Sequence, residues 1–349
     1  MPSCIVLFSG GLDSALALRL MAVQGVAVTA FYARNCFQGG GQEAAAREAD
    51  LRRRALVLGA AGLEVRDLTG EVIELVKRPR YGLGRNMNPC LDCRLRTLRE
   101  AAALRQEMNA DFVATGEVIG QRPMSQRKDA MRTVLRHAKD WGLEGLLLRP
   151  LCAQLLEPTI PEERGWVDRS RLLGLSGRGR GPQMELAREW GITEFPSPAG
   201  GCLLTDPGYG ARLRELNRAR PAWTARDAEL LKIGRHFRAA PGLRVVASRD
   251  AGENEALKTA LPAGAVVCVT AERPGAMVAL VDEREDGARA EDADWEAALA
   301  VARGLAVRYS RYREAGVADI GEWRQGVPDS RAAVPGVRAV DPETLEGRI

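Results

Sequence analysis

The sequence contains no run of about 18 consecutive apolar residues, the length that a helix needs to cross a membrane, so no membrane span is expected. Its first residues also lack a basic stretch followed by an apolar segment and a cleavage site, which predicts a cytoplasmic protein. The 349 residues are 46% hydrophobic and 28% charged, a composition typical of a globular chain with two or three domains. A net charge of +4 excludes a uniformly basic nucleic-acid coat but is compatible with a local basic face.

Histidine is scarce, and the number of cysteines is odd. Only His137 and His236 are present, and neither has the spacing from cysteine that a Cys₂His₂ zinc finger requires. An odd number of cysteines in a cytoplasmic chain argues against a disulfide framework and favours metal or redox chemistry. The seven cysteines are Cys4, Cys36, Cys90, Cys93, Cys152, Cys202 and Cys268.

A glycine-rich turn at residues 9–14, with the sequence SGGLDS, follows an apolar and β-branched run at residues 4–8. The run predicts a buried parallel strand, and a helix is predicted from Asp13 onward. The two glycines let the main chain approach a ligand closely, and the N-terminus of a helix offers free N–H groups to an anion. The turn lacks the Gly-Lys-Ser/Thr of a Walker loop and the three-glycine spacing of a dinucleotide-binding loop. A phosphate-binding turn is therefore predicted, with an ordinary strand-to-helix turn as the alternative.

Strands and helices alternate over the first 115 residues. Further strands are predicted at 26–32, 63–68 and 110–116, and helices at 43–58 and 91–108. This alternation predicts an α/β fold with a parallel, doubly wound sheet whose ligands bind beyond the carboxyl ends of the strands. The turn at 9–14 and the turn at Thr115 and Gly116 both lie at such ends.

The C-terminal part has a different pattern, with strands predicted at 243–248, 265–270 and 276–281 and helices at 253–260 and 294–312. These elements predict a smaller α+β domain. The Pro- and Gly-rich residues from Gly326 onward are expected to form a loosely packed tail. The predicted division of the chain is a nucleotide domain, a cysteine-bearing extension, the α+β domain and the tail, at residues 1–150, 151–222, 223–325 and 326–349.

Cys90 and Cys93 form a Cys-x-x-Cys motif at the start of a predicted helix, whose dipole is expected to lower the pKa of both thiols. Alone, the motif is compatible with a redox pair, half of a zinc site or ligands of an iron–sulfur cluster. A third cysteine, Cys202, follows Gly200 and Gly201, which would let its backbone approach a ligand. Three cysteines can bind three irons of a [4Fe-4S] cluster and leave the fourth iron open to sulfide. The alternatives are buried core cysteines, or a persulfide relay between Cys90 and Cys202.

The SGGxDS turn resembles the pyrophosphate loop (PP-loop) of the ATP pyrophosphatases, which adenylate a substrate oxygen and release pyrophosphate. With the Asn-Pro-Cys-x-x-Cys segment at 88–93, the Ala-Thr-Gly turn at 114–116 and Gly-Cys-Leu-Leu-Thr-Asp at 201–206, residues 1–215 are similar to the tRNA thiolation enzymes. The resemblance implies an adenine nucleotide alpha hydrolase-like fold that binds ATP and Mg²⁺. Asp13 would organise Mg²⁺ or the attacking oxygen. The residues that would hold ATP are Ser9, Gly10, Gly11, Asp13, Ser14 and Gly116.

The resemblance also bears on the cysteines. In the persulfide-using members an Asp precedes a single catalytic cysteine, whereas here Asp92 lies between Cys90 and Cys93, which favours the cluster-using branch. Cys90, Cys93 and Cys202 are therefore implied as metal ligands and, with Asp13, as catalytic residues. The two-cysteine members have a His after the Thr-Gly turn, and this chain has Glu117 there.

Two features suggest contact with RNA. Basic loops at 120–128 and 176–181 suit phosphate contacts, with ordinary solvated loops as the alternative. Residues 228–285 resemble the small RNA-associated domain of the NFACT ribosome quality-control proteins, which implies a tRNA-docking platform. A packing domain with ordinary surface arginines is the alternative. The contacts implied by this resemblance are Arg235, His236, Arg238 and Lys258.

These observations together predict an ATP-dependent tRNA sulfurtransferase that adenylates a uridine carbonyl and replaces its oxygen with sulfur, using a [4Fe-4S] cluster. A PP-loop sulfur insertase acting on a small molecule, and an RNA-binding adaptor with a vestigial ATP site, are the alternatives. The expected partners are tRNA and a sulfur donor, which is either sulfide or a sulfur-carrier protein. The uridine position, the modified carbon and the oligomeric state stay open, with a homodimer as one option.

Overall fold

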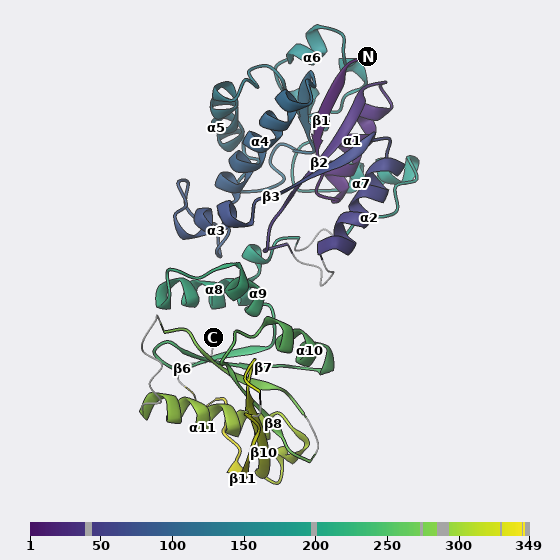
Figure 1. Cartoon of the computed structure of the whole chain (residues 1–349). Helices are drawn as coiled ribbons and strands as arrows, with labels where there is room; N and C mark the ends of the chain where they lie inside the picture. Colours follow the sequence, from purple (N-terminus) through teal and green to yellow (C-terminus); the bar gives the residue numbers. More distant parts are fainter. Residues whose placement is uncertain are drawn as a thin grey trace. The chain divides into compact units, whose positions relative to one another are not determined.

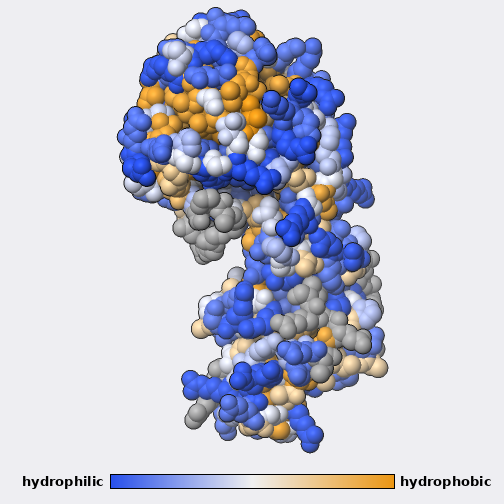
Figure 2. Space-filling model, turned by 180° about the vertical axis from the view of Figure 1, so that it is seen from behind, coloured by the Kyte–Doolittle hydropathy of each residue, from blue (hydrophilic) through white to orange (hydrophobic). Residues whose placement is uncertain are grey.

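The computed structural model divides into two compact units, Met1–Thr205 and Asp206–Ile349 (Figure 1). Among the residues that the structure describes, no helix combines the length and the apolarity that a membrane span requires. On the face drawn in Figure 2, the N-terminal unit displays a patch of hydrophobic residues, and hydrophilic residues predominate on the C-terminal unit. The described residues are 1–38, 44–196, 201–272, 275–284, 293–328, 330–343 and 345.

The N-terminal unit is built on a five-stranded sheet in which each neighbouring pair of strands is parallel. The strands, in their order across the sheet, are β3 (Gly62–Asp67), β2 (Ala27–Arg34), β1 (Ser3–Leu7), β4 (Phe112–Thr115) and β5 (Leu147–Leu148). Leu7 pairs with Thr115, so the loops after β1 and β4 leave the sheet side by side. The predicted α/β fold with a parallel sheet is confirmed.

Helices cover both faces of this sheet (Figure 1). Cys4 and Val6 of β1 pack in one core with α1, α2 and α7, whereas Ile5 and Leu7 pack in another with α4 and α5. Alternate side chains of a strand point to opposite faces, so an apolar run buried on both faces is the expected sequence of a central parallel strand. The helices of this unit are α1 (Leu12–Ala22), α2 (Ala44–Val57), α3 (Thr69–Lys77), α4 (Cys90–Glu107), α5 (Lys128–Asp140), α6 (Ile160–Glu163) and α7 (Gly181–Glu189), with 3₁₀ turns η1 (Ala153–Leu155), η2 (Arg169–Arg171) and η3 (Leu203–Thr205).

The C-terminal unit contains a six-stranded antiparallel sheet with α11 packed against its apolar core. The strands, in their order across the sheet, are β11 (Ala332–Arg338), β10 (Val317–Arg324), β8 (Val266–Thr270), β9 (Val278–Asp282), β7 (Leu243–Ala247) and β6 (Arg235–Ala240). The helices are α8 (Pro207–Ala219), α9 (Ala225–Leu230), α10 (Ala251–Ala260) and α11 (Ala293–Arg308), followed by the 3₁₀ turn η4 (Arg311–Arg313). The predicted smaller α+β domain is confirmed.

Two details at the end of the chain differ from the sequence-based expectation. Residues 332–338, expected in a loose tail, form β11 and pair with β10, because Val334 and Val337 pack against the core beneath α11. The helix expected over 294–312 ends at Arg308, since the Ser310 hydroxyl donates to the Val307 carbonyl at 2.8 Å and accepts from the Tyr312 amide at 3.1 Å. These local bonds replace the helical ones and start η4.

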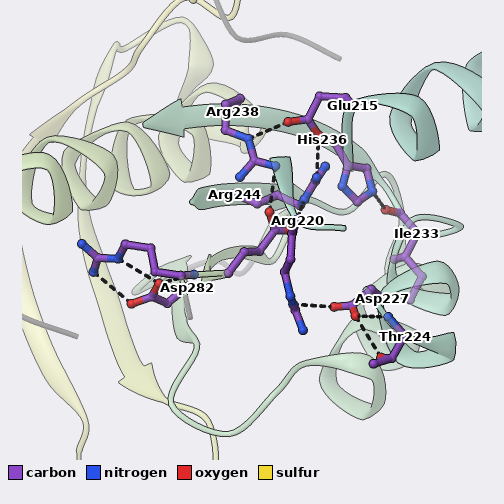
Figure 3. Close-up of polar contacts among 11 residues, drawn as sticks. Glu215, Arg220, Thr224, Asp227, Ile233, His236, Arg238, Arg244 and Asp282 are labelled. Carbon is purple, nitrogen blue, oxygen red and sulfur yellow. Dashed lines mark hydrogen bonds and ion pairs between the residues drawn. The ribbon is translucent and has the colours of Figure 1, made fainter. Parts of the chain in front are cut away.

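A closed ring of buried ion pairs fixes α8 to the sheet of the C-terminal unit (Figure 3). Glu215 of α8 accepts from Arg238 of β6 at 2.7 Å and from Arg244 of β7 at 2.6 Å. Glu283 faces the same two arginines, at 2.7 Å from Arg238 and 2.6 Å from Arg244. Two positive and two negative side chains thus neutralise one another, which is how full burial of Arg244 becomes tolerable. We call these four residues the Arg–Glu ring.

Replacing Glu283 with Gln should lower the free energy of unfolding of the C-terminal unit by about 3–5 kcal/mol, because two enclosed guanidinium groups lose half of their negative charge. The matched control is Glu255→Gln, which removes an exposed partner of Lys258 and should cost less than about 1 kcal/mol. Urea unfolding followed by circular dichroism measures both. Equal losses in the two variants would show that the Arg–Glu ring contributes nothing beyond a surface ion pair.

Candidate nucleotide and cysteine site

The turn after β1 has the geometry of an anion-binding loop. Gly10 takes a φ of 77°, a conformation that favours glycine, and a Cβ there would lie 2.5 Å from a methyl carbon of Leu51. The Ser14 hydroxyl donates to the Gly11 carbonyl at 2.8 Å and accepts from the Ser9 amide at 3.3 Å, which folds the turn around Ser14. Gly11 caps α1 without a side-chain hydrogen bond, so the first N–H groups of α1 stay available to an anion.

Gly116, predicted as an ATP contact, lies directly against this turn. A Cβ at Gly116 would come within 2.5 Å of the Asp13 carbonyl oxygen and 2.8 Å of the Ser14 amide nitrogen. Only a residue without a side chain lets the end of β4 pack so closely on the first turn of α1. Gly116 therefore supports the phosphate loop through its backbone.

Asp13 is held by polar side chains from two other segments. Its Oδ2 accepts from the Gln121 side-chain amide at 2.7 Å and lies 3.7 Å from a guanidinium nitrogen of Arg180. Gln183 of α7 in turn donates to Gln121 at 3.2 Å. The other oxygen of Asp13, Oδ1, is buried and has no hydrogen-bond partner among the described residues. Sequence reasoning missed Gln121 and Gln183 and assigned Arg180 to an RNA loop, because nothing in local spacing shows that α7 packs beside α1.

The three predicted cysteines come together in the N-terminal unit. Cys90 and Cys93 occupy the first turn of α4, at a spacing that places both on one face of the helix. Cys202 is brought to them by η3: the Leu203 amide donates to the Phe37 carbonyl at 2.8 Å, and the Met87 amide donates to the Leu204 carbonyl at 3.2 Å. Residues 197–200, including the predicted ligand-approach glycine Gly200, lie outside the described residues.

The thiols of Cys93 and Cys202 are kept protonated by their surroundings. Burial, and then the neighbouring Cys90, raise the pKa of Cys93 to about 11. Burial, with further contributions from Cys93 and Cys90, raises the pKa of Cys202 to about 12. The expected lowering by the helix dipole is therefore wrong for Cys93, because loss of hydration outweighs it. Thiols in this arrangement ionise readily only when a positive centre binds them.

The three cysteines do not form a site for a single metal ion. No group of three or more His, Cys, Asp or Glu in the described ranges is arranged to hold one metal ion. In a [4Fe-4S] cluster each cysteine binds a different iron, so its sulfurs lie farther apart than the ligands of a single ion. The Asn88 amide also donates to the Cys90 sulfur at 3.2 Å, a contact that stabilises negative charge on sulfur.

Asp92, between the two cysteines, has a structural role. Its two carboxylate oxygens accept from the backbone amides of Arg80 and Tyr81, both at 3.1 Å. These bonds hold the segment before α4 against the start of the helix. Asp92 thereby helps to position the helix turn that carries Cys90 and Cys93.

Glu117 is the main site residue whose role the sequence did not indicate. It is fully buried, accepts from Arg149 at 2.8 Å and from Thr115 at 3.1 Å, and forms an ion pair with Arg94 at 3.1 Å. Burial alone would raise the pKa of Glu117, but Arg94 and Arg149 outweigh burial and hold it below its usual value. Arg94 follows Cys93 on α4, so Glu117 ties the end of β4 to the cysteine helix.

The structure changes the set of candidate RNA contacts. The two predicted basic loops lie together, since Ile119 and Ser176 form a β-bridge and the Gly177 amide donates to the Ile119 carbonyl at 2.7 Å. His236, by contrast, is buried, and burial together with Arg244 holds its pKa well below its usual value. Arg238 belongs to the Arg–Glu ring. The prediction of His236 as an RNA contact is therefore wrong, and Arg238 is already paired with two glutamates.

Comparison with known proteins agrees with this architecture. The family model of the tRNA methyl transferase HUP domain matches residues 3–144, and that of the NFACT protein RNA binding domain matches residues 234–334. The tRNA-specific 2-thiouridylase MnmA of Enterobacter sp. (strain 638) is 28% identical over 138 residues, which cover 37% of this chain and 37% of that protein. The chain thus spans little more than a third of the length of the curated relatives it matches.

Two solved structures align with the chain at low similarity. A 4-thiouridine synthetase–RNA complex with bound ATP has a TM-score of 0.39 and 16% identity, covering 80% of this chain and 55% of that one. The U34-tRNA thiolase NcsA from Methanococcus maripaludis with its [4Fe-4S] cluster has a TM-score of 0.30 and 13% identity, covering 66% of this chain and 73% of that one.

The chain therefore combines a HUP domain of the tRNA methyl transferase type with an NFACT-type RNA-binding domain. Over part of its length it is similar to the tRNA-specific 2-thiouridylases. The family resemblance inferred from the SGGxDS turn and the cysteines is confirmed.

Glu117→Gln should lower the free energy of unfolding of the N-terminal unit by about 3–5 kcal/mol at pH 7, because Arg149 and Arg94 lose a buried counter-charge. The folded-state pKa of Glu117 is below the usual 4.5, so its contribution is present above that pH and lost as the pH falls through the folded-state value. The variant should therefore differ most from the wild type near neutrality and converge with it in acid. Urea unfolding at several pH values measures this, with Glu64→Gln on exposed β3 as the control. A difference that did not shrink in acid would contradict the assignment.

Proposed function

We propose that this protein is an ATP-dependent tRNA sulfurtransferase. The observation that carries the proposal is that two adjacent residues, Gly116 and Glu117, connect the glycine-rich turn at residues 9–14 with the cysteine helix α4. Gly116 packs on the phosphate loop at Asp13, and Glu117 pairs with Arg94 beside Cys93. A site for activating an oxygen with ATP and a site for delivering sulfur are thereby built on the end of one strand. ATP activation followed by sulfur transfer needs both features in one unit.

The loop residues bind and orient the nucleotide. The N-terminus of α1 and the main chain at Gly10 and Gly11 favour the negative charge of the ATP phosphates. Arg180, already beside Asp13, adds a positive charge that stabilises the departing pyrophosphate. The unpartnered Oδ1 of Asp13 is the atom that would hold Mg²⁺ with the phosphates. In this proposal a uridine carbonyl oxygen attacks the α-phosphate, and the resulting AMP ester is a good leaving group.

The cysteines supply the sulfur side of the reaction. Cys90, Cys93 and Cys202 would hold a [4Fe-4S] cluster, which supplies a site at which sulfide is kept close to the activated carbon. Asn88 and Asp92 position the first two of these cysteines. The burial that raises the pKa of Cys93 and Cys202 also excludes water, which would otherwise hydrolyse the activated uridine. A persulfide relay between Cys90 and Cys202 is the competing arrangement.

The NFACT-type domain supports tRNA as the substrate, since its family model is that of an RNA-binding domain. A basic surface formed by the two adjacent loops at 120–128 and 176–181 lies in the unit that carries the proposed active site. Such loops bind phosphates without reading sequence, so they would position an RNA whose modified base enters the site. The sulfur donor is sulfide or a sulfur-carrier protein.

The direct test uses thiolation of unmodified tRNA with ATP and sulfide under anaerobic conditions, with mass spectrometry of the nucleosides. Replacing Cys90, Cys93 or Cys202 with Ala should reduce thiolation to about a hundredth or less, because in the proposal each of these thiols is needed to deliver sulfur to the activated carbon. Cys152→Ala, which changes a buried thiol bonded to the Glu117 carbonyl, should stay within about threefold of the wild type. Asp13→Ala should stop AMP formation while leaving the fold intact. Thiolation by the Asp13 variant at the wild-type rate would refute the proposal.

The cluster assignment has its own test. Protein reconstituted anaerobically with iron and sulfide should show a broad absorbance near ~400 nm and contain about four irons per chain. Cys93→Ala should lose most of this iron, and Cys268→Ala, which alters a buried thiol in the C-terminal unit, should retain it. Thiolation by a protein free of iron would support the persulfide relay in place of the cluster.

A further inference from the structure

Arginines gather where α11 of the C-terminal unit ends. The sequence from 308 to 313 is Arg-Tyr-Ser-Arg-Tyr-Arg, a basic run with interleaved aromatic residues. Ser310 stops the helix and starts η4 with its two local hydrogen bonds. The chain turns there, so Arg308 at the end of the helix and Arg313 in η4 line the same surface hollow. We call Arg308, Tyr309, Ser310, Arg311 and Arg313, with the neighbouring Arg235, the 308–313 patch.

The patch surrounds a hollow of about 290 Å³, lined by Arg308, Tyr309, Ser310 and Arg313. The guanidinium carbon of Arg235 lies 4.7 Å from the centroid of the Tyr309 ring, which places a further positive group beside these residues. A Cβ at Gly275 would come within 2.9 Å of Ser310, so a neighbouring segment packs closely on the turn and holds its backbone. The hollow is therefore lined by positive and hydroxyl groups on a fixed backbone.

The arginines between residues 308 and 313 are clustered and are not neutralised by acids among the described residues. In the described part of the chain, Arg308, Arg311 and Arg313 have no carboxylate within ion-pair distance. Of the two nearby acids, Glu272 accepts from the Tyr312 hydroxyl at 2.9 Å, and Glu314 is exposed. Six other arginines of the unit are paired with acids, namely Arg220, Arg238, Arg244, Arg249, Arg284 and Arg303. Unpaired guanidinium groups leave a local positive potential that attracts an anion.

We propose that the 308–313 patch binds the phosphodiester backbone of RNA, and that it takes the docking role that the sequence had given to His236 and Arg238. A guanidinium group presents paired N–H donors that match phosphate oxygens. Three arginines over six residues, with Arg235 beside them, suit successive phosphates better than one small anion. The proposal deepens the proposed function, on which it rests for tRNA as the substrate.

The test measures binding of fluorescein-labelled bulk bacterial tRNA to the full chain by fluorescence anisotropy, at several salt concentrations. The double variant Arg308→Ala/Arg313→Ala should bind about tenfold or more weakly. Its plot of log affinity against log salt should be shallower by roughly 1.4 to 1.8, as expected for the loss of two phosphate contacts. The matched control is Arg218→Ala/Arg338→Ala, which removes the same charge from two exposed arginines of the same unit. The control should stay within about twofold of the wild type, and equal weakening of both double variants would overturn the proposal.

Two further measurements separate the other outcomes. Inorganic phosphate, compared with chloride at equal ionic strength, should not displace the labelled tRNA from the wild type. Specific displacement at about millimolar phosphate would assign the patch to a small anion and overturn the proposal. If the wild type binds tRNA through the patch but does not thiolate it, the sulfurtransferase function is refuted and the patch is not. If the wild type thiolates tRNA but the Arg308→Ala/Arg313→Ala variant binds tRNA as tightly, the patch is refuted and the function is not. Thermal unfolding of both double variants confirms that their folds are retained.

Discussion

The N-terminal unit depends on the contact between the end of β4 and the two segments that flank it. Gly116 allows the first turn of α1 to lie against the strand at a distance that no side chain would permit. Glu117, the next residue, is buried among Arg94, Arg149 and Thr115 and fixes the helix that carries Cys90 and Cys93. One dipeptide thereby sets the position of the phosphate loop and of the cysteine pair relative to the sheet. Neighbouring parallel strands make this arrangement available, since their loops emerge at the same edge.

The cysteine site shows how burial and charge compete. A helix N-terminus stabilises a thiolate, but loss of water around Cys93 and Cys202 costs more than the dipole returns. Because the thiols of Cys93 and Cys202 resist ionisation, they are poor nucleophiles in this state. A persulfide relay through Cys202 would therefore need an additional means of lowering the pKa of that thiol.

Two groups of arginines in the C-terminal unit differ in their surroundings. In the Arg–Glu ring two arginines are paired with two glutamates, and these ion pairs join α8 to β6 and β7. The arginines at the end of α11 have no such partners in the described residues and face a hollow. Both groups look alike in the sequence, because an arginine in a strand and one after a helix carry the same charge. Only the position of the nearest carboxylate distinguishes a structural arginine from one available to a ligand.

The sequence by itself determined the parallel sheet and the glycine-rich turn after β1, because these features depend on local patterns of apolar residues and glycines. It also singled out three cysteines that the structure brings together. It also indicated the α+β character of the second unit, although β6, β10 and β11 escaped notice. Tertiary structure alone decided that Glu117 joins a buried ion-pair network, that Arg180 faces Asp13, and that His236 is buried while Arg238 is paired with Glu215 and Glu283. The physical reason is that burial and pairing depend on residues distant in the chain. Glu117 and Arg149, for example, are 32 positions apart, and no local pattern records that they meet.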